Sequence, residues 1–352
     1  MKVADTAFAA LLLHWQAEHG RHDLPWQSDR DPYRVWLSEI MLQQTQVETV
    51  HRYYDRFLTR FPDIAALAAS DLDDVLAMWS GLGYYSRARN LHRCAITVQR
   101  EFNGAFPGSM AELEQLPGIG RSTAAAIASI CFGERAAILD GNVRRVLSRY
   151  LGFDGDLSSH AQVNLLWRHA EELLPRQDLS KDMPRYTQAI MDLGATVCRS
   201  SRPACAECPL AVRCAAKRQG LQGRLPFKSR KLVRRAECWW LLWIQSPAGE
   251  DWLEKRPETG IWAGLYCLPV MTGQTLFEKT LNALNIVERM DLPVVVHALT
   301  HVDLHLHPVR VKLVQRSPLD FTIPGGWHAA TERRNLGLPA PIRAMLDSQR
   351  RE

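Results

Sequence analysis

The sequence contains no apolar run long enough to cross a membrane, and no internal repeat or low-complexity tract is evident in its 352 residues. The apolar stretch within residues 1–20 (MKVADTAFAALLLHWQAEHG) is too short for a span or a signal peptide, and no small-residue cleavage site follows it. This stretch predicts an amphipathic helix. We therefore expect no membrane partner and a cytoplasmic location, where cysteines seldom form structural disulfides.

The composition also lacks extremes. An apolar fraction of 46% and a charged fraction of 23% are ordinary for a globular protein, which excludes a disordered or fibrous chain. The length of 352 residues exceeds what one compact core usually takes, so two domains are predicted. The formal net charge of +5 is mild and only permits a polyanionic partner. Basic residues concentrate in 217–235, which has no acid and predicts an interdomain linker, a phosphate-contacting strap, or both.

Two kinds of pattern divide the chain. From residue 1 to about 215, apolar residues recur at spacings of three and four, which predicts several short helices around one core. After the basic segment, AECWWLLWIQ and LPVVVHALTHVDLHLHPVRVKLVQ carry strand signals. Helices are predicted at about 275–287 and 340–348. The second domain is therefore expected to be α+β, with the boundary between 217 and 235.

The eight cysteines need an explanation other than disulfides. Four of them lie within seventeen residues, and four thiolates this close suit a tetrahedral zinc ion or a [4Fe–4S] cube equally well: Cys198, Cys205, Cys208 and Cys214. Their spacing does not choose between these metals. The remaining four, Cys94, Cys131, Cys238 and Cys267, lie apart and are expected to be ordinary buried thiols.

Residues 116–124 (LPGIGRSTA) form a glycine-containing turn between two helical stretches. Gly118 and Gly120 allow the backbone to approach an anion closely, and the start of the following helix offers unpaired N–H groups to a phosphate. The pattern is the helix-hairpin-helix signature, which holds a DNA backbone without reading its sequence. The alternative is a plain turn between helices.

Two acids are candidates for chemistry. Asp140 follows an apolar run and precedes a helix, so it is either an N-cap or a carboxylate held beside the phosphate-binding turn. Glu39 has Val35, Trp36 and Leu42 as its helical neighbours, which places its carboxyl group on an apolar face. Burial is expected to raise its pKa toward the range of a proton donor, unless the residue is a structural acid paired with Arg.

These residues, in order, resemble the helix-hairpin-helix DNA glycosylase superfamily, and within it the adenine glycosylases of the MutY type. The resemblance is carried by LPWQ (24–27), VWLSEIMLQQTQV (35–47), GLGYYSRARNLH (81–92), LPGIGRSTA (116–124), ILDGNVRRVL (138–147) and QAIMDLGATVC (188–198). It implies an all-α catalytic region in 1–216, with a six-helix barrel at about 30–140. The N-terminal helix and about 141–216 would form an iron–sulfur module, whose [4Fe–4S] cluster the four clustered cysteines would hold.

The resemblance also implies roles for single residues. Glu39 matches the acid that protonates adenine at N7 and then activates water, and Asp140 matches the aspartate that stabilises the cationic sugar. Ser122 stands where endonuclease III-type enzymes carry a nucleophilic Lys, which implies base removal with little strand cleavage. Trp26 and Gln188 match the adenine pocket. Residues implied to contact DNA are Gln44, Tyr84, Leu116, Gly118, Gly120, Ser122 and Thr123.

Residues 236–352 resemble the Nudix-like domain that recognises 8-oxoguanine on the opposite strand, with the best local match at 256–269. The helix LFEKTLNALNI offers only Glu278, too few acids for the metal ions of a Nudix hydrolase, so this domain is expected to bind and not hydrolyse. The family's sensing loop often reads Phe-Ser-His, whereas this chain has Leu299-Thr300-His301. Thr300 and His301 keep hydrogen-bonding groups. The strand histidines His297, His305 and His307 are expected to face solvent.

The sequence thus predicts a monomeric base-excision repair enzyme that hydrolyses adenine from double-stranded DNA opposite 8-oxoguanine or G. In a bacterium it would be associated with the nucleoid. The competing hypothesis is a non-catalytic DNA-binding module that uses the hairpin and the basic linker, with the metal as a structural clamp. Under that hypothesis, replacing Glu39 by Gln changes nothing measurable.

Overall fold

The structure, a computed structural model, describes residues 6–229, 233–316, 321 and 323–348. It divides into two compact units: one takes the described residues of 1–54, 63–65 and 93–231, and the other takes those of 55–62, 66–92 and 232–352. The domain limits predicted from the sequence stay a prediction. No described helix combines the length and apolarity needed to cross a membrane.

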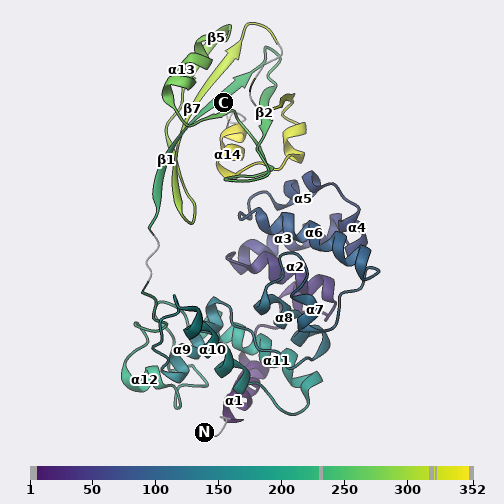
Figure 1. Cartoon of the computed structure of the whole chain (residues 1–352), viewed down its shortest axis with the longest axis vertical. Coiled ribbons are helices and arrows are strands. Elements are labelled where there is room, and N and C mark those ends of the chain that lie inside the picture. Colours follow the sequence, from purple (N-terminus) through teal and green to yellow (C-terminus); the bar gives the residue numbers. More distant parts are fainter. Residues whose placement is uncertain (1–5, 230–232, 317–320, 322, 349–352) are drawn as a thin grey trace. The chain divides into compact units, whose positions relative to one another are not determined.

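Helices make up nearly all of the regular structure before residue 233 (Figure 1). In chain order they are α1 (Thr6–His19), η1 (Pro25–Gln27), α2 (Pro32–Leu42), α3 (Val47–Arg60), α4 (Ile64–Ala68), α5 (Leu72–Trp79), α6 (Ser86–Glu101), α7 (Met110–Leu113), α8 (Arg121–Phe132), α9 (Gly141–Leu151), α10 (His160–Glu172), α11 (Leu179–Asp192), η2 (Leu193–Val197) and α12 (Ala215–Gln219).

The predicted amino-terminal helix is present as α1, and one of its faces belongs to the core of the first unit. Phe8, Leu12 and Trp15 are buried there among side chains of α8 to α11. The rings of Phe8 and Tyr150 lie 4.6 Å apart. Burial of each large apolar side chain contributes roughly 1.5–3 kcal/mol, so this face of α1 stabilises the packing of α8 to α11.

The second unit contains one eight-stranded sheet with the order β3-β2-β1-β7-β5, in which β4 also pairs with β1, β6 with β7, and β8 with β2. The strands are β1 (Arg235–Gln245), β2 (Asp251–Lys255), β3 (Tyr266–Cys267), β4 (Val270–Met271), β5 (Ile286–Asp291), β6 (Val295–Ala298), β7 (Val302–Leu313) and β8 (Gly325–His328). Figure 1 shows β1 and β7 side by side; they run parallel from Arg235 opposite Val302 to Gln245 opposite Lys312.

The sheet packs against α13 (Gln274–Asn282) through Phe277 and Leu281, and α14 (Ala340–Ser348) and η3 (Glu332–Asn335) follow the last strand. Strands after residue 235 together with these helices confirm the predicted α+β second domain. The helix predicted for about 275–287 is too long, because it ends at Asn282. Residues from Ile286 instead form β5, since pairing with β7 outweighs local helix preference.

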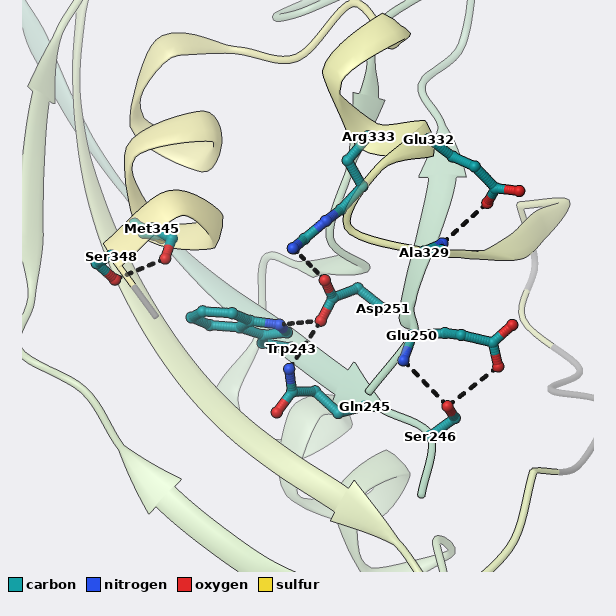
Figure 2. Close-up of polar contacts among 10 residues, drawn as sticks. All are labelled: Trp243, Gln245, Ser246, Glu250, Asp251, Ala329, Glu332, Arg333, Met345 and Ser348. Atoms are coloured by element: carbon teal, nitrogen blue, oxygen red, sulfur yellow. Dashed lines mark hydrogen bonds and ion pairs between the residues drawn. The ribbon is translucent and has the colours of Figure 1, made fainter. Parts of the chain in front are cut away.

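A buried ion pair ties η3 to the sheet. Asp251, on β2, accepts hydrogen bonds from Trp243 Nε1 (2.7 Å) and Gln245 Nε2 (3.0 Å) and pairs with the guanidinium of Arg333 (Figure 2). Burial raises the pKa of the Asp251 carboxyl group, and these donors oppose the rise. Because Asp251, Trp243 and Arg333 are all buried, removing Arg333 alone would leave a carboxylate in the core without its counter-charge.

The strand histidines differ from expectation. His297, His305 and His307 are half-buried, and the ring of His307 stacks on that of Trp240 at 5.2 Å. Burial lowers the pKa of His297. The prediction that these side chains face solvent therefore holds only in part: the ring of Trp240 covers His307, and that of Trp262 lies 5.9 Å from the ring of His297.

Candidate functional site

Two cavities in the first unit share four lining residues. The larger, of about 760 Å³, reaches from the end of α2 to the start of α9, and the smaller, of about 170 Å³, lies beside η1 and α11. Both are lined by Arg21, Trp26, Glu39 and Gln188. The structure thus brings together the predicted acid and both predicted adenine-pocket residues, which come from α2, η1 and α11.

Glu39 is placed by the start of α2. Pro32 occupies the first helical position, and the Asp31 side chain accepts a hydrogen bond from the Arg34 backbone N–H at 2.9 Å. Val35 and Trp36 are buried as expected for the face that carries Glu39. No hydrogen bond or ion pair to the Glu39 carboxyl group forms within the described ranges, so the alternative of an acid paired with Arg is not observed.

The electrostatics of Glu39 suit a proton donor. Burial, and then the negative charge of Asp140, raise its pKa from the ordinary 4.5 to about 7. A carboxyl group with that pKa is half protonated at neutral pH. Such a group can donate a proton and, once ionised, can accept one.

Asp140 is both an N-cap and a wall of the larger cavity. Its side chain accepts a hydrogen bond from the Val143 backbone N–H at 2.7 Å and so begins α9. Burial raises the pKa of Asp140, whereas hydrogen bonds from Val143 and Asn142 and the charges of Arg145 and Arg144 oppose that rise. These donors favour the ionised form, and the charge of that form is one cause of the raised pKa of Glu39. The two roles left open by the sequence therefore coexist.

The hairpin joins α7 to α8 through the predicted turn. Gly118 has φ +77°, in the left-handed region that favours glycine, and Gly120 caps α8. A Cβ at Gly120 would meet no atom within 4 Å, so the space beside this residue, which precedes α8, is open. Leu116 is buried and anchors the turn.

The hairpin is tied to both acids. Ser122 Oγ accepts a hydrogen bond from the Leu139 backbone N–H at 3.1 Å, next to Asp140. Thr123 Oγ1 accepts one from Gln43 Nε2 at 3.3 Å, at the end of α2. Gln44 follows with φ +56° and an exposed side chain that lines the larger cavity. Hydrogen bonds therefore connect the hairpin to the segments that carry both carboxyl groups.

Trp26 and Gln188 line both cavities. The buried ring of Trp26 lies edge-on to that of Tyr54, with centroids 5.4 Å apart. Gln188 Nε2 donates to Asp192 Oδ1 at 2.9 Å, and Asp192 pairs with Arg21. The side chain of Gln27, on the wall of the smaller cavity, keeps its buried amide nitrogen and oxygen without partners in the described part of the chain.

The four clustered cysteines surround one small cavity. Cys198 follows η2, and Cys214 caps α12. Arg149 Nη1 donates to Cys198 Sγ at 3.4 Å, and Arg145 Nε donates to the Cys198 carbonyl at 2.7 Å. Among the described residues, no three His, Cys, Asp or Glu side chains are arranged to hold a single metal ion.

The predicted contacts to the opposite strand lie in the second unit. Tyr84, at φ +50° and exposed, has its hydroxyl 3.3 Å from Thr300 Oγ1. His301 is exposed, and its carbonyl accepts a hydrogen bond from the Arg235 N–H. Residues 84 and 300 are far apart in sequence, yet the structure brings these two side chains together.

Sequence reasoning missed the residues that hold Gln188. The four-residue spacing of Gln188 and Asp192 on α11 is a signal for a side-chain contact that was available. Arg21 lies 171 positions before Asp192, and no periodicity relates the two. The hydrogen bond from Arg145 to the Cys198 carbonyl was also missed, because Arg145 is one of several basic residues after Asp140 and nothing in the sequence distinguishes it.

Comparisons with known proteins agree with this framework. Residues 37–172 match the model of the HhH-GPD superfamily base excision DNA repair protein, and 240–348 match a NUDIX domain. The structure resembles that of a thermostable thymine-DNA glycosylase, with a TM-score of 0.53 at 27% identity, over 60% of this chain and 96% of that one. A non-covalent endonuclease III–DNA complex, at 22% identity, supports the fold, with a TM-score of 0.50 over 61% of this chain and 95% of that one.

Curated relatives extend over almost the whole chain. The adenine DNA glycosylase of Buchnera aphidicola subsp. Acyrthosiphon pisum is 37% identical over 349 residues, which are 97% of this chain and 97% of the relative. The adenine DNA glycosylase of Rattus norvegicus is 33% identical over 411 residues, covering 98% of this chain and 78% of the relative. The predicted helical catalytic region with a C-terminal Nudix-like domain and the predicted adenine glycosylase class are confirmed, whereas the iron–sulfur module and the low strand cleavage stay predictions. The chain belongs to the adenine DNA glycosylase family of the helix-hairpin-helix base-excision repair enzymes.

Proposed function

We propose that this chain hydrolyses the N-glycosidic bond of adenine mispaired with 8-oxoguanine or G in double-stranded DNA, as a monomer and without nicking the strand. The observation that carries the proposal is the pairing of two unlike carboxyl groups in one cavity. Glu39 has a pKa near neutrality because it is buried beside Asp140, whose N-cap donors favour its charged form. Such a pair divides acid and electrostatic roles.

The reaction follows from those roles. The flipped adenine enters between Trp26 and Gln188, and Glu39 gives its proton to N7 as the bond from N9 to C1′ breaks. The electron pair of that bond leaves with adenine, and the ionised Asp140 stabilises the positive charge on the sugar. The Glu39 carboxylate then takes a proton from water as the water oxygen bonds to C1′. The products are free adenine and an abasic site.

The hairpin holds the DNA for this step. The open backbone N–H groups at the start of α8, after Gly118 and Gly120, would receive a phosphate, with the helix dipole favouring its charge. Gln44 and Thr123 would contact the same strand. The hydroxyl of Ser122 cannot form an imine with the abasic sugar, so the chain has no covalent route to strand cleavage there.

Cys198, Cys205, Cys208 and Cys214 would hold the [4Fe–4S] cluster. The fit rests on the four cysteines, which line one cavity. Arg149 donates a hydrogen bond to Cys198 Sγ, and Lys217 also lines the cavity, so both cations would offset the negative charge of the thiolates. Bound there, the cluster would cross-link the loop of residues 198–214. Arg145, which donates to the Cys198 and Gly194 carbonyls, joins that loop to α9, the helix that Asp140 caps.

The C-terminal domain would supply recognition of 8-oxoguanine through Thr300 and His301. Glu278 is the one acid in the segment LFEKTLNALNI, where a Nudix hydrolase would need several. Its carboxylate lies 3.9 Å from the guanidinium of Arg289 on β5. This supports a binding role without hydrolysis. Tyr84, whose hydroxyl is beside Thr300, would enter the duplex as an aromatic wedge.

A base-release assay tests the function. Duplexes with adenine opposite 8-oxoguanine, G, C or T are incubated with the protein, and each sample is divided and read with and without hot alkali. We expect cleavage after alkali for the first two duplexes and little without alkali, because Ser122 offers no amine. Intact adenine opposite both purines would refute the proposal, and cleavage without alkali would contradict its monofunctional part. The substitution Ser122→Lys places an amine at this position, so the same assay shows whether an amine there allows cleavage without alkali.

Iron analysis tests the cofactor. The purified protein should be yellow-brown and contain iron and acid-labile sulfide in equal amounts, with zinc absent. Replacing Cys205→Ser should reduce iron content, whereas Cys94→Ser, which alters a buried thiol outside the 198–214 segment, should leave it unchanged. Stoichiometric zinc without sulfide would contradict the assignment.

A further inference from the structure

The buried carboxylate of Asp192 organises one wall of the site. Its side chain is 1% exposed, and Arg21 donates to it three times: from Nη2 to Oδ1 at 2.6 Å, from Nε to Oδ1 at 2.7 Å, and from the backbone N–H to Oδ2 at 3.0 Å. The fourth donor is Gln188 Nε2, at 2.9 Å from Oδ1. Asp192 lines neither of the two cavities described above but holds two residues that line both.

A carboxylate in an ion pair only accepts hydrogen bonds. The Gln188 amide therefore turns its NH₂ group toward Asp192, because the opposite orientation would place the amide oxygen against a negative charge. The Gln188 Oε1 atom is left as the acceptor, and no hydrogen bond to it forms among residues 6–229 of the first unit. The pocket consequently presents the Gln188 amide oxygen as a hydrogen-bond acceptor, and Asp192 fixes this orientation of the amide.

We propose that Asp192 is a positioning residue that makes the pocket select a 6-aminopurine over a 6-oxopurine. In the orientation that Asp192 fixes, Gln188 Oε1 accepts a hydrogen bond from the exocyclic amine of adenine. The 6-oxo group of hypoxanthine is itself an acceptor, so the two oxygens would repel each other. Arg21 neutralises the buried carboxylate of Asp192 and holds it in place. The inference rests on the proposed entry of adenine between Trp26 and Gln188.

The test compares three bases opposite 8-oxoguanine: adenine, hypoxanthine and unsubstituted purine, which has no group at C6. Single-turnover rate constants are measured for the wild type and for Asp192→Asn. We expect the rate loss to be about 10-fold greater for adenine than for purine, the value of one hydrogen bond. The ratio of hypoxanthine to adenine release should rise by at least that factor. A role in folding alone would slow all three bases equally, which would overturn the proposal.

A double-mutant cycle separates action through Gln188 from other effects. In a Gln188→Ala background, Asp192→Asn should not change the ratios among the three bases, since the amide it orients is gone. The same change of ratio in that background would contradict the proposal.

If Asp192→Asn fails to fold because Arg21 is left as an unpaired charge, R21Q/D192N removes both charges and should show the same change of ratio. An unchanged ratio in that folded variant would overturn the proposal. Glu39→Gln is run beside these variants. If it releases adenine at the wild-type rate, the proposed function fails, whereas its inactivity together with unchanged ratios in the Asp192 variants refutes only this inference.

Discussion

Replacing Glu39 by Gln is expected to slow the release of adenine by about 10³-fold under single-turnover conditions, while binding of the duplex persists. Gln keeps the shape of the side chain but has no proton to give to N7, and general acid catalysis supplies roughly 10²–10⁴-fold. Because the Glu39 carboxyl group forms no hydrogen bond with the hairpin within the described part of the chain, the proposed phosphate contacts should survive. The measurement is a rate at saturating enzyme, with a gel-shift titration of the same duplex.

The pH dependence of the wild type has a definite direction. The proposed reaction begins from the proton-bearing form of Glu39, whose pKa is about 7, so the rate should fall as pH rises through that value. Stability moves the same way. The folded chain retains the proton up to about pH 7 and the unfolded chain loses it near 4.5, so this stabilisation is full below 4.5 and lost as pH rises through 7.

Glu39→Gln should therefore be inactive yet more resistant to urea at pH 8 than the wild type, by about 2 kcal/mol, because a buried carboxylate has been replaced by a neutral amide. The matched control is Glu48→Gln, which alters an exposed acid of α3 and should change neither rate nor urea midpoint appreciably. A folded Glu39→Gln protein that releases adenine at the wild-type rate would exclude Glu39 from the proposed chemistry.

The parts of the site that were predictable have local signatures. The hairpin follows from the LPGIG turn, in which Gly118 adopts a positive φ that favours glycine and Gly120 precedes α8. The apolar neighbours of Glu39 follow from helical periodicity, and so does its raised pKa. The two-domain fold follows from the change of periodicity after the basic segment, since helical spacing and strand alternation cannot be satisfied by one architecture.

The parts that were not predictable depend on tertiary pairing. Nothing local relates Arg21 to Asp192, and the orientation of the Gln188 amide depends on both. The same holds for Tyr84 and Thr300, whose hydroxyl groups meet through the fold alone. The end of α13 was misjudged because β7 offers Ile286 a strand partner that periodicity does not reveal.

Asp140→Asn is expected to lower the rate of adenine release by about 10²–10³-fold while leaving the fold intact. Asn is as good an N-cap as Asp, so α9 should still begin at Gly141, and only the charge that stabilises the cationic sugar is lost. Asp140→Ala removes the cap as well and should cost about 1 kcal/mol more stability than the Asn variant. Comparing the two separates the helix-starting role from the electrostatic one.

The residual activity of Asp140→Asn carries a second test of the pair. The negative charge of Asp140 is one of the two causes that raise the pKa of Glu39, so its removal should move the falling limb of the rate profile below pH 7. Burial alone would then hold the pKa of Glu39 above 4.5. A profile that keeps its midpoint near 7 would show that the two carboxyl groups act independently, and a rate equal to the wild type would remove Asp140 from the chemistry.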